Sequence, residues 1–333
     1  MALVRNSLVV LIVLLVSGWT ASAQTTAPSR EKVIIDTDVG DDVDDAFAID
    51  LALASPEVDI LGISTAWGDT AMRARMVDRM LCETGRTEIT VRAGISTKAT
   101  SAFTQLPWAR AGAARNLRDD AVTFLLEQIK AHPGEITLIA LGPLTNVGAA
   151  IDRDPATFSR LKRVVLMGGS IYRGYDKRDS TAATPAEPEY NIDRDPKAAQ
   201  KLFHSGVPIF LLPLDSTQIK FDASRRSRLT TISTPMTDAL QILQAEWSRG
   251  TGKADETLFD AVAVAYAIDP TTCAMTQVHI EVDEKGMTRP TPGLANAQAC
   301  LMPKQEAFFN LLMPRLLQQK LIGEKACLAP ATR

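Results

Sequence analysis

The stretch Lys32–Asp50, KVIIDTDVGDDVDDAFAID, connects a predicted strand to a predicted helix through an acidic loop. Residues 33–35 are apolar and β-branched, which is typical of a buried strand. Residues 44–54 (DDAFAIDLALA) begin with two aspartates, which suit the positive end of a helix dipole, and continue as an apolar helix. A buried strand that ends in acid before a helix is the usual ligand-binding edge of an α/β sheet.

Short apolar runs alternate with helical segments along the rest of the chain. Strands are expected at 58–65, 135–141, 163–167 and 208–212, and helices at 71–85, 119–132 and 257–268. This alternation predicts an α/β fold: one Rossmann-like domain over residues 31–333, with an open, mainly parallel sheet covered by helices on both faces. The polar loop 173–188 is long enough for a lid beside the site, and equally for a passive surface insertion.

The composition is that of a globular protein. Of 333 residues, 46% are apolar and 23% are charged, and the net charge is −3. Because no basic field is available to attract phosphates, the sequence argues against nucleic acid or anionic lipid as a partner. A small molecule is the expected ligand.

Residues 1–23 have the three parts of a secretory signal peptide. Arg5 gives a positive start, residues 8–16 (LVVLIVLLV) are apolar, and Ala21-Ser22-Ala23 offers a cleavage site. An uncleaved anchor is the alternative, but the apolar run is short for a hydrocarbon layer of about 30 Å. We expect a periplasmic or secreted protein that has no membrane attachment after cleavage.

Four cysteines remain, at positions 82, 273, 300 and 327. In an exported protein they can pair, and a disulfide in the C-terminal region is one interpretation because three of the four lie there. Buried free thiols are the other, and spacing alone does not decide between them.

Six carboxylates lie between residues 36 and 45. Packed together they would repel one another, so several must take up protons or bind a cation. Oxygen ligands suit Ca²⁺ or Mg²⁺ rather than zinc, and Gly40 allows a tight turn that brings Asp38 toward Asp45. A solvated acidic turn is the plain alternative. An EF-hand does not fit the spacing, and a phosphatase with an aspartyl nucleophile would need a later lysine and acidic pair, for which no convincing set is found.

The segment IIDTDVGDDVDDAFAI resembles the N-terminal signature of the inosine-uridine preferring nucleoside hydrolases. Further segments of that family are matched in the same order, so that the resemblance runs from about residue 32 to about residue 290: 60–69 (ILGISTAWGD), 140–146 (ALGPLTN) with 165–169 (VLMGG), 189–191 (EYN) with 195–196, and 259–261 (FDA). The resemblance implies the nucleoside hydrolase fold and hydrolysis of the N-glycosidic bond of ribonucleosides.

The family also implies roles for individual residues. Its calcium ligands match Asp38, Asp45, Asp260 and the backbone carbonyl of Thr145, and its general base matches Asp44. Residues that grip the ribose match Glu189 and Asn191, Asp69 falls near the nucleoside, and Asp36 would support the cluster from behind. The chemistry agrees, since carboxylates stabilise the positive charge that develops on the sugar when the bond to the base breaks.

The chain departs from the family pattern in three places. Asp41 and Asp42 are additional in the acidic loop, so either could take a role, and Val39 replaces a proline. Phe259 stands where many members have a histidine that protonates the leaving base, and the histidines of this chain (132, 204 and 279) are expected to be structural or exposed. An aromatic at 259 could stack on a purine, as could Trp67, Tyr190 or Trp108, so purine nucleosides are weakly favoured.

Two other functions stay open on the sequence. A periplasmic protein could bind ribonucleosides in a retained pocket without turnover, which the missing histidine and altered loop would explain. A hydrolase could instead act on another N-riboside, such as nicotinamide riboside. The family resemblance also allows a homo-oligomer, for which the sequence carries no interface signal.

Overall fold

The computed structural model describes residues 30–112, 118–177 and 184–319. Residues 1–23, where a signal peptide is expected, lie outside this part. Eight strands form one sheet in the order β3-β2-β1-β4-β5-β6-β10-β7. Their bounds are β1 Glu31–Thr37, β2 Val58–Thr65, β3 Thr90–Ala93, β4 Ile136–Ala140, β5 Arg163–Met167, β6 Ile209–Leu212, β7 Cys273–Val278 and β10 Ala297–Pro303. All neighbouring pairs are parallel except β10 with β7.

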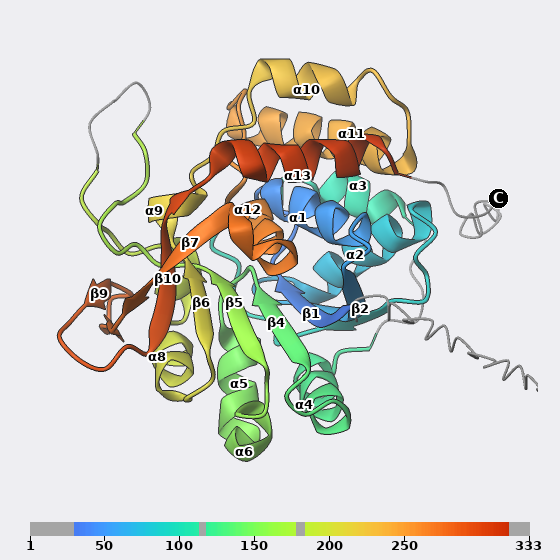
Figure 1. The fold of residues 1–333 in the computed structure, drawn as a ribbon. Coiled ribbons are helices and arrows are strands. Elements are labelled where there is room, and N and C mark those ends of the chain that lie inside the picture. Colours follow the sequence, from blue (N-terminus) through green and yellow to red (C-terminus); the bar gives the residue numbers. More distant parts are fainter. Residues whose placement is uncertain (1–29, 113–117, 178–183, 320–333) are drawn as a thin grey trace, which may run out of the picture.

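Helices cover both faces of the sheet (Figure 1). Along β1, Val33 and Ile35 point into one apolar core and Ile34 into the other, so this strand is buried on both sides. The first core is closed by α1 Asp44–Leu53, α2 Thr70–Glu83, α3 Leu106–Ala111, α11 Pro235–Thr251, α12 Phe259–Ile268 and α13 Gln305–Leu317. The second is closed by α4 Ala121–Ala131, α5 Thr145–Arg153, α6 Pro155–Phe158 and α8 Pro196–His204.

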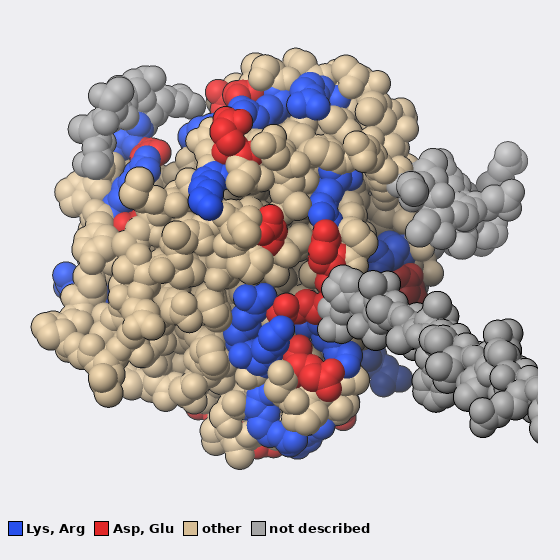
Figure 2. Space-filling view, viewed as in Figure 1, with Lys and Arg blue, Asp and Glu red and all other residues tan. Residues whose placement is uncertain are grey.

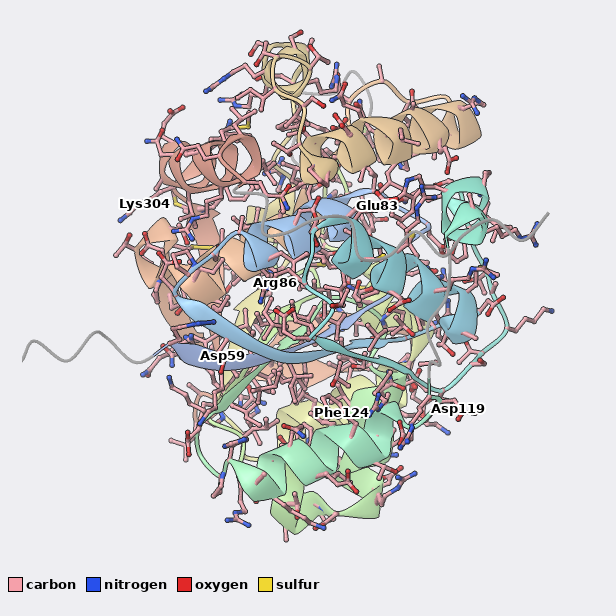
Figure 3. The ribbon with its side chains drawn as sticks, turned by 90° about the vertical axis from the view of Figure 1, so that its right-hand side faces the viewer. Asp59, Glu83, Arg86, Asp119, Phe124 and Lys304 are labelled. Atoms are coloured by element: carbon pink, nitrogen blue, oxygen red, sulfur yellow. A yellow bond between two sulfur atoms is a disulfide. The ribbon has the colours of Figure 1, made fainter. Side chains whose placement is uncertain are left out.

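The side view in Figure 3 shows the sheet between these two layers, with Phe124 of α4 on one side and Glu83 of α2 on the other. Phe124 lies so close to Gly62 of β2 that a Cβ at position 62 would be 2.5 Å from its ring. A glycine is therefore needed for the helix to approach the sheet this closely. Short elements complete the described chain: α7 Tyr190–Arg194, α9 Leu214–Thr217, α10 Ala223–Leu229, η1 Pro270–Thr272, and the two-stranded sheet of β8 Ile280–Val282 and β9 Thr288–Pro290.

A disulfide between Cys273 and Cys300 joins β7 to β10, the antiparallel pair at one edge of the sheet. The expectation of a bridge in the C-terminal region is therefore confirmed, while Cys327 lies outside the described residues. In the described ranges no helix is both long and apolar enough to cross a membrane. Figure 2 shows acidic and basic side chains interspersed over the visible face, where no continuous basic patch appears.

The α/β class and the parallel sheet are confirmed. The five expected strands are β1, β2, β4, β5 and β6, and the expected helices are α1, α2, α4 and α12, within two residues at each end.

Candidate active site

The candidate site lies where the carboxyl ends of β1, β4 and β5 meet the beginnings of α1, α7 and α12. The chain after β1 turns to β2 on one side, whereas β4 joins β1 on the other, so this is a switch point of the sheet. A cavity of about 340 Å³ opens there, near the lower end of the range for small-molecule sites. Its lining includes the predicted site residues Asp38, Asp44, Asp45, Glu189, Asn191, Phe259 and Asp260.

Three buried aspartates from distant parts of the chain converge in this cavity. Asp44, Asp45 and Asp260 each offer a carboxylate oxygen within 4.8 Å of the others. Asp44 Oδ2 accepts a hydrogen bond of 3.0 Å from the backbone N–H of Asp260, so the beginning of α12 fixes its orientation. Asp45 accepts from the Thr37 hydroxyl at the end of β1. The cluster is thus built by backbone geometry and helix beginnings, and not by flexible surface side chains.

Burial raises the pKa of the cluster, and the neighbouring negative charges raise it further. The pKa of Asp45 rises to about 7, mainly through burial, and the pKa values of Asp38, Asp44 and Asp260 rise for the same first reason. The Asp45 and Asp260 carboxyl groups each offer an oxygen within 4.8 Å of the other, and the repulsion between them is relieved when one takes up a proton. A hard divalent cation would replace that proton and balance the charges, so the donor set fits Ca²⁺ or Mg²⁺.

One of the two additional loop aspartates is neutralised from behind. Arg73 of α2 is 1% exposed, and its Nη2 lies 3.0 Å from Asp41 Oδ1. The same guanidinium donates to the carbonyls of Asp38, Val39 (2.9 Å) and Trp67 (2.8 Å). Arg73 therefore holds the backbone of the acidic loop and pairs with Asp41, which leaves Asp42 as the added carboxylate with no ion pair among the described residues.

The motif Ala140–Asn146 supports the loop from the side. A Cβ on Gly142 would lie 2.9 Å from Asp38 Oδ1, so only glycine allows this close approach. Asn146 Nδ2 donates to Asp36 Oδ1 (2.8 Å) and to the Thr65 carbonyl (3.0 Å), which ties together the ends of β1 and β2. The pKa of Asp36 rises to about 6 through burial, against the hydrogen bonds it accepts. Asp36 thus lies behind the cluster, as expected.

Glu189 and Asn191 sit at the start of α7. The oxygens of Glu189 accept from the backbone N–H groups of Gly169 (2.8 Å), Asn191 (2.9 Å) and Ile192 (3.2 Å), while burial raises its pKa to about 7. Asn191 Nδ2 donates to the carbonyls of Leu141 (2.7 Å) and Met167 (3.1 Å). With its nitrogen committed to the ends of β4 and β5, Asn191 presents its amide oxygen as an acceptor.

Aromatic side chains form the remaining wall of the cavity. Phe259 packs edge-on against Tyr175, with ring centroids 6.2 Å apart. The Tyr190 hydroxyl bonds to Ser101 (2.8 Å), whose own hydroxyl donates to Asp41. Trp247, near the end of α11, also lines the space. The cavity therefore has an acidic end and an aromatic end.

Three predicted site residues, Asp69, Trp67 and Thr145, are not among the described residues that line the cavity. Asp69 is exposed and caps α2, accepting from the Met72 N–H (3.0 Å). Trp67 has a left-handed φ of 63°, and its backbone carbonyl accepts a hydrogen bond from the Arg73 guanidinium. Thr145 is the first residue of α5, and its hydroxyl donates to Asp195 (3.0 Å).

Of the weaker sequence candidates, Tyr190 lines the cavity, whereas Trp108 and the three histidines are not in the described lining. Trp108 packs in α3 under the Arg79 guanidinium, 3.9 Å from its ring, and is not a stacking partner for a ligand. The three histidines lie away from the site, as expected; His204 and His279 bond to backbone carbonyls.

Four residues of the site were not predicted: Arg73, Tyr175, Trp247 and Lys253. Tyr175 lies in the long loop that the sequence marked as a possible lid. Arg73 gave no such signal, because α2 also carries Arg75 and Arg79 and the sequence does not show which arginine is buried.

Comparisons with known proteins decide the family. The sequence profile described as "Inosine-uridine preferring nucleoside hydrolase" matches residues 33–310. The chain belongs to this family. Membership identifies it as a ribonucleoside N-ribohydrolase that acts on a small-molecule nucleoside.

Two relatives are named for the hydrolysis of pyrimidine nucleosides. The chain is 28% identical over 271 residues to the pyrimidine-specific ribonucleoside hydrolase RihB of Escherichia coli, covering 76% of this chain and 83% of that protein. It is 36% identical over 217 residues to the probable uridine nucleosidase 2 of Arabidopsis thaliana, covering 60% of this chain and 64% of that protein. The chain thus spans less than two thirds of this plant relative.

Solved structures share the fold. A plant nucleoside hydrolase, PpNRh1, matches with a TM-score of 0.72 at 26% identity, covering 87% of this chain and all of that one. A purine-preferring ribonucleoside hydrolase from Gardnerella vaginalis matches with a TM-score of 0.72 at 25% identity, covering 87% and 99%.

Proposed function

We propose that this nucleoside hydrolase uses Ca²⁺ to release the base from ribonucleosides, with a preference for purine nucleosides. The observation that carries the proposal is the convergence of Asp44, Asp45 and Asp260 in one cavity that also contains Asn191. An acidic end suits a cation and a ribose, and an aromatic end suits a flat base.

The ion would be held by Asp38, Asp45 and Asp260, with the Thr145 carbonyl as a further ligand. When bound, Ca²⁺ would fix the ribose diol and make the attacking water easier to deprotonate. The raised pKa values of the cluster support this assignment, because buried carboxylates without a cation must otherwise hold protons.

Asp44 is the proposed general base. Its Oδ2 is held by the Asp260 N–H, so its other oxygen is left to take the proton from water as the oxygen attacks the anomeric carbon. As the bond to the base breaks, positive charge spreads over the ring, and the surrounding carboxylates stabilise it. Asn191 supplies an acceptor for a ribose hydroxyl, while Glu189 fixes the α7 backbone that presents Asn191.

The preference for purines rests on the aromatic end. Phe259, Tyr175, Tyr190 and Trp247 offer ring surface around the space beyond the sugar, and a two-ring base buries more of it than a one-ring base. The purine-preferring enzyme among the structural neighbours is consistent with this preference, whereas relatives named as uridine nucleosidases provide the competing expectation.

Free ribose released from inosine, adenosine, uridine and cytidine tests the proposal. The protein is stripped with a chelator and then assayed with Ca²⁺, Mg²⁺ or Zn²⁺, and metal binding is followed in parallel by calorimetry. We expect turnover to return with Ca²⁺ and kcat/KM to be higher for purine nucleosides. Turnover of none of the four by the Ca²⁺-loaded protein would contradict the proposal, and higher values for uridine and cytidine would contradict the purine preference.

Asp44→Asn separates the general base from the rest of the site. Loss of a general base lowers kcat by about 10²–10⁴-fold, and Ca²⁺ binding should persist because Asp38, Asp45 and Asp260 remain. Asp50→Asn is the matched control, since Asp50 is a buried aspartate of the same helix and does not line the cavity. Equal losses in the two variants would contradict the role of Asp44.

We also propose export to an oxidising compartment, on the basis of the signal-like residues 1–23. The Cys273–Cys300 bridge supports this, because disulfides persist in such compartments. Fractionation of cells that express the full chain, followed by N-terminal sequencing of the mature protein, would test both location and cleavage; an intact N-terminus in the cytoplasmic fraction would contradict it.

A further inference from the structure

Seven carboxylate side chains and one ammonium group line the cavity among the described residues. Lys253 is the single positively charged side chain among the described residues that line it, against Asp38, Asp41, Asp42, Asp44, Asp45, Glu189 and Asp260. Its ammonium makes no ion pair or hydrogen bond within the described chain, whereas Asp41 is already paired with Arg73. A free ammonium at the edge of an acidic cavity has the chemistry to meet negative charge on a ligand.

The position of Lys253 is set by the end of α11. Gly252 terminates the helix with a left-handed φ of 69°, and the next residue turns back toward the cavity. The Lys253 carbonyl accepts from the Ser248 hydroxyl (2.5 Å), and its N–H donates to Thr251 Oγ1 (3.3 Å). The backbone is thus held at both polar groups while the side chain stays exposed.

Lys253 lies on the wall that the base would face. The proposed cation and ribose ligands come from the loop after β1 and from α7 and α12, whereas Lys253 and Trp247 come from the end of α11. In a nucleoside whose sugar is held at the acidic end, the base would point toward this second wall. Burial raises the pKa of Asp42, and the positive charge of Lys253 opposes this rise, so the lysine acts electrostatically on the acidic loop.

Among the described lining residues, the aromatic groups near Lys253 offer no charged donor. Phe259 has no proton to give, and Tyr190 is engaged with Ser101. The Tyr175 hydroxyl accepts from the Tyr190 N–H (3.0 Å), and burial together with the charge of Glu189 raises its pKa, which makes an anionic or proton-releasing role harder.

We propose that Lys253 determines specificity by stabilising the departing base, and that it favours bases that leave with negative charge on a carbonyl oxygen. This inference rests on the proposed function. The bond from the anomeric carbon to the base nitrogen breaks, and its electron pair stays on the base. The ammonium donates a hydrogen bond to that charge and passes a proton to the base, while water supplies hydroxide to the sugar and a proton to Asp44. Asp44 then releases its proton to solvent and Lys253 takes one up, which returns both groups to their starting state.

The experiment compares substrates whose leaving groups need different help. Inosine has a carbonyl where adenosine has an amino group, and para-nitrophenyl riboside releases a stable anion without assistance. We expect Lys253→Met to lower kcat for inosine about 10–100-fold, adenosine less, and the nitrophenyl riboside within about threefold. Lys253→Arg, which keeps the charge, should restore most of the inosine activity.

Lys220→Met is the matched control. Lys220 also acts on the charge of Asp42, but its Nζ donates to Thr257 (2.5 Å) and it does not line the cavity, so kcat on all three substrates should stay within about threefold. Equal losses of Lys253→Met on inosine and the nitrophenyl riboside, or no loss on either, would overturn the proposal. If the wild type is inactive on every nucleoside, the proposed function is rejected. That outcome is separate from a failure of the Lys253 proposal, because the variants are compared only with an active wild type.

Discussion

Replacing Arg73 with methionine should destabilise the protein strongly while preserving most of its apolar volume. The guanidinium is 1% exposed and pairs with Asp41, whose side chain is 13% exposed. It also donates hydrogen bonds to the backbone carbonyls of Asp38, Val39 and Trp67. Removing one partner of a buried pair leaves an uncompensated charge, so the expected loss in the free energy of unfolding is about 3–5 kcal/mol.

Urea denaturation of the wild type, Arg73→Met, Asp41→Asn and the double variant would measure the coupling. The double variant no longer leaves the Asp41 carboxylate without its partner, so its loss should be smaller than the sum of the two single losses by at least about 1 kcal/mol. Arg75→Met is the control on the same helix: Arg75 is half-buried and donates to the carbonyls of Arg110 and Gly112, so its loss should be about 1 kcal/mol. Additive single losses, or an Arg73→Met loss no larger than that of the control, would refute the reasoning.

Three other outcomes are expected. Burial raises the pKa of Asp50, so its carboxyl group stays protonated to higher pH in the folded protein than in the unfolded chain. The resulting contribution to the free energy of unfolding is complete below about pH 4 and is lost as pH rises through the folded pKa. In urea denaturation at a series of pH values, Asp50→Asn should therefore show a smaller fall in stability with rising pH than the wild type. Cys273→Ser with Cys300→Ser opens a loop of sequence separation 27, which should lower the unfolding free energy by about 3.5 kcal/mol and leave kcat of the folded fraction unchanged; a lowered kcat would contradict this. Residue 40 has a φ of 125°, and Gly40→Ala would also place a methyl group against the Phe103 ring, so the melting temperature should fall. An unchanged melting temperature would argue against this packing.

The central sheet could be predicted because its strands are buried on both faces. Continuous apolar runs such as 33–35 and 163–167 have no competing interpretation as surface strands. The edge strands were missed for the opposite reason: the four middle positions of β7 (CAMTQV) are exposed or half-buried, and they carry polar residues without a clear alternation. Helix α11 was also missed, although Thr234 and Thr237 form a capping box at its start.

The acidic half of the site could be predicted, whereas in the aromatic half only Phe259 and Tyr190 could be, and Tyr175 and Trp247 could not. Asp38, Asp44 and Asp45 are close in sequence, and their repulsion alone predicts a cation. The partner of Asp41 could not be read from the chain, because Arg73 reaches the loop from another helix. Lys253 becomes significant only when the end of α11 is placed against the cavity.

The hydrogen bond from the Asp260 N–H to Asp44 spans 216 positions of the chain, and this separation has a consequence for biosynthesis. A ribosome that has made β1 to β6 has supplied six of the eight strands of the central sheet, yet the proposed base still lacks the backbone contact that orients it. Hydrolytic competence would therefore arise late and abruptly, when α12 docks, and a nascent chain stalled before that helix should be folded in part but inert toward nucleosides.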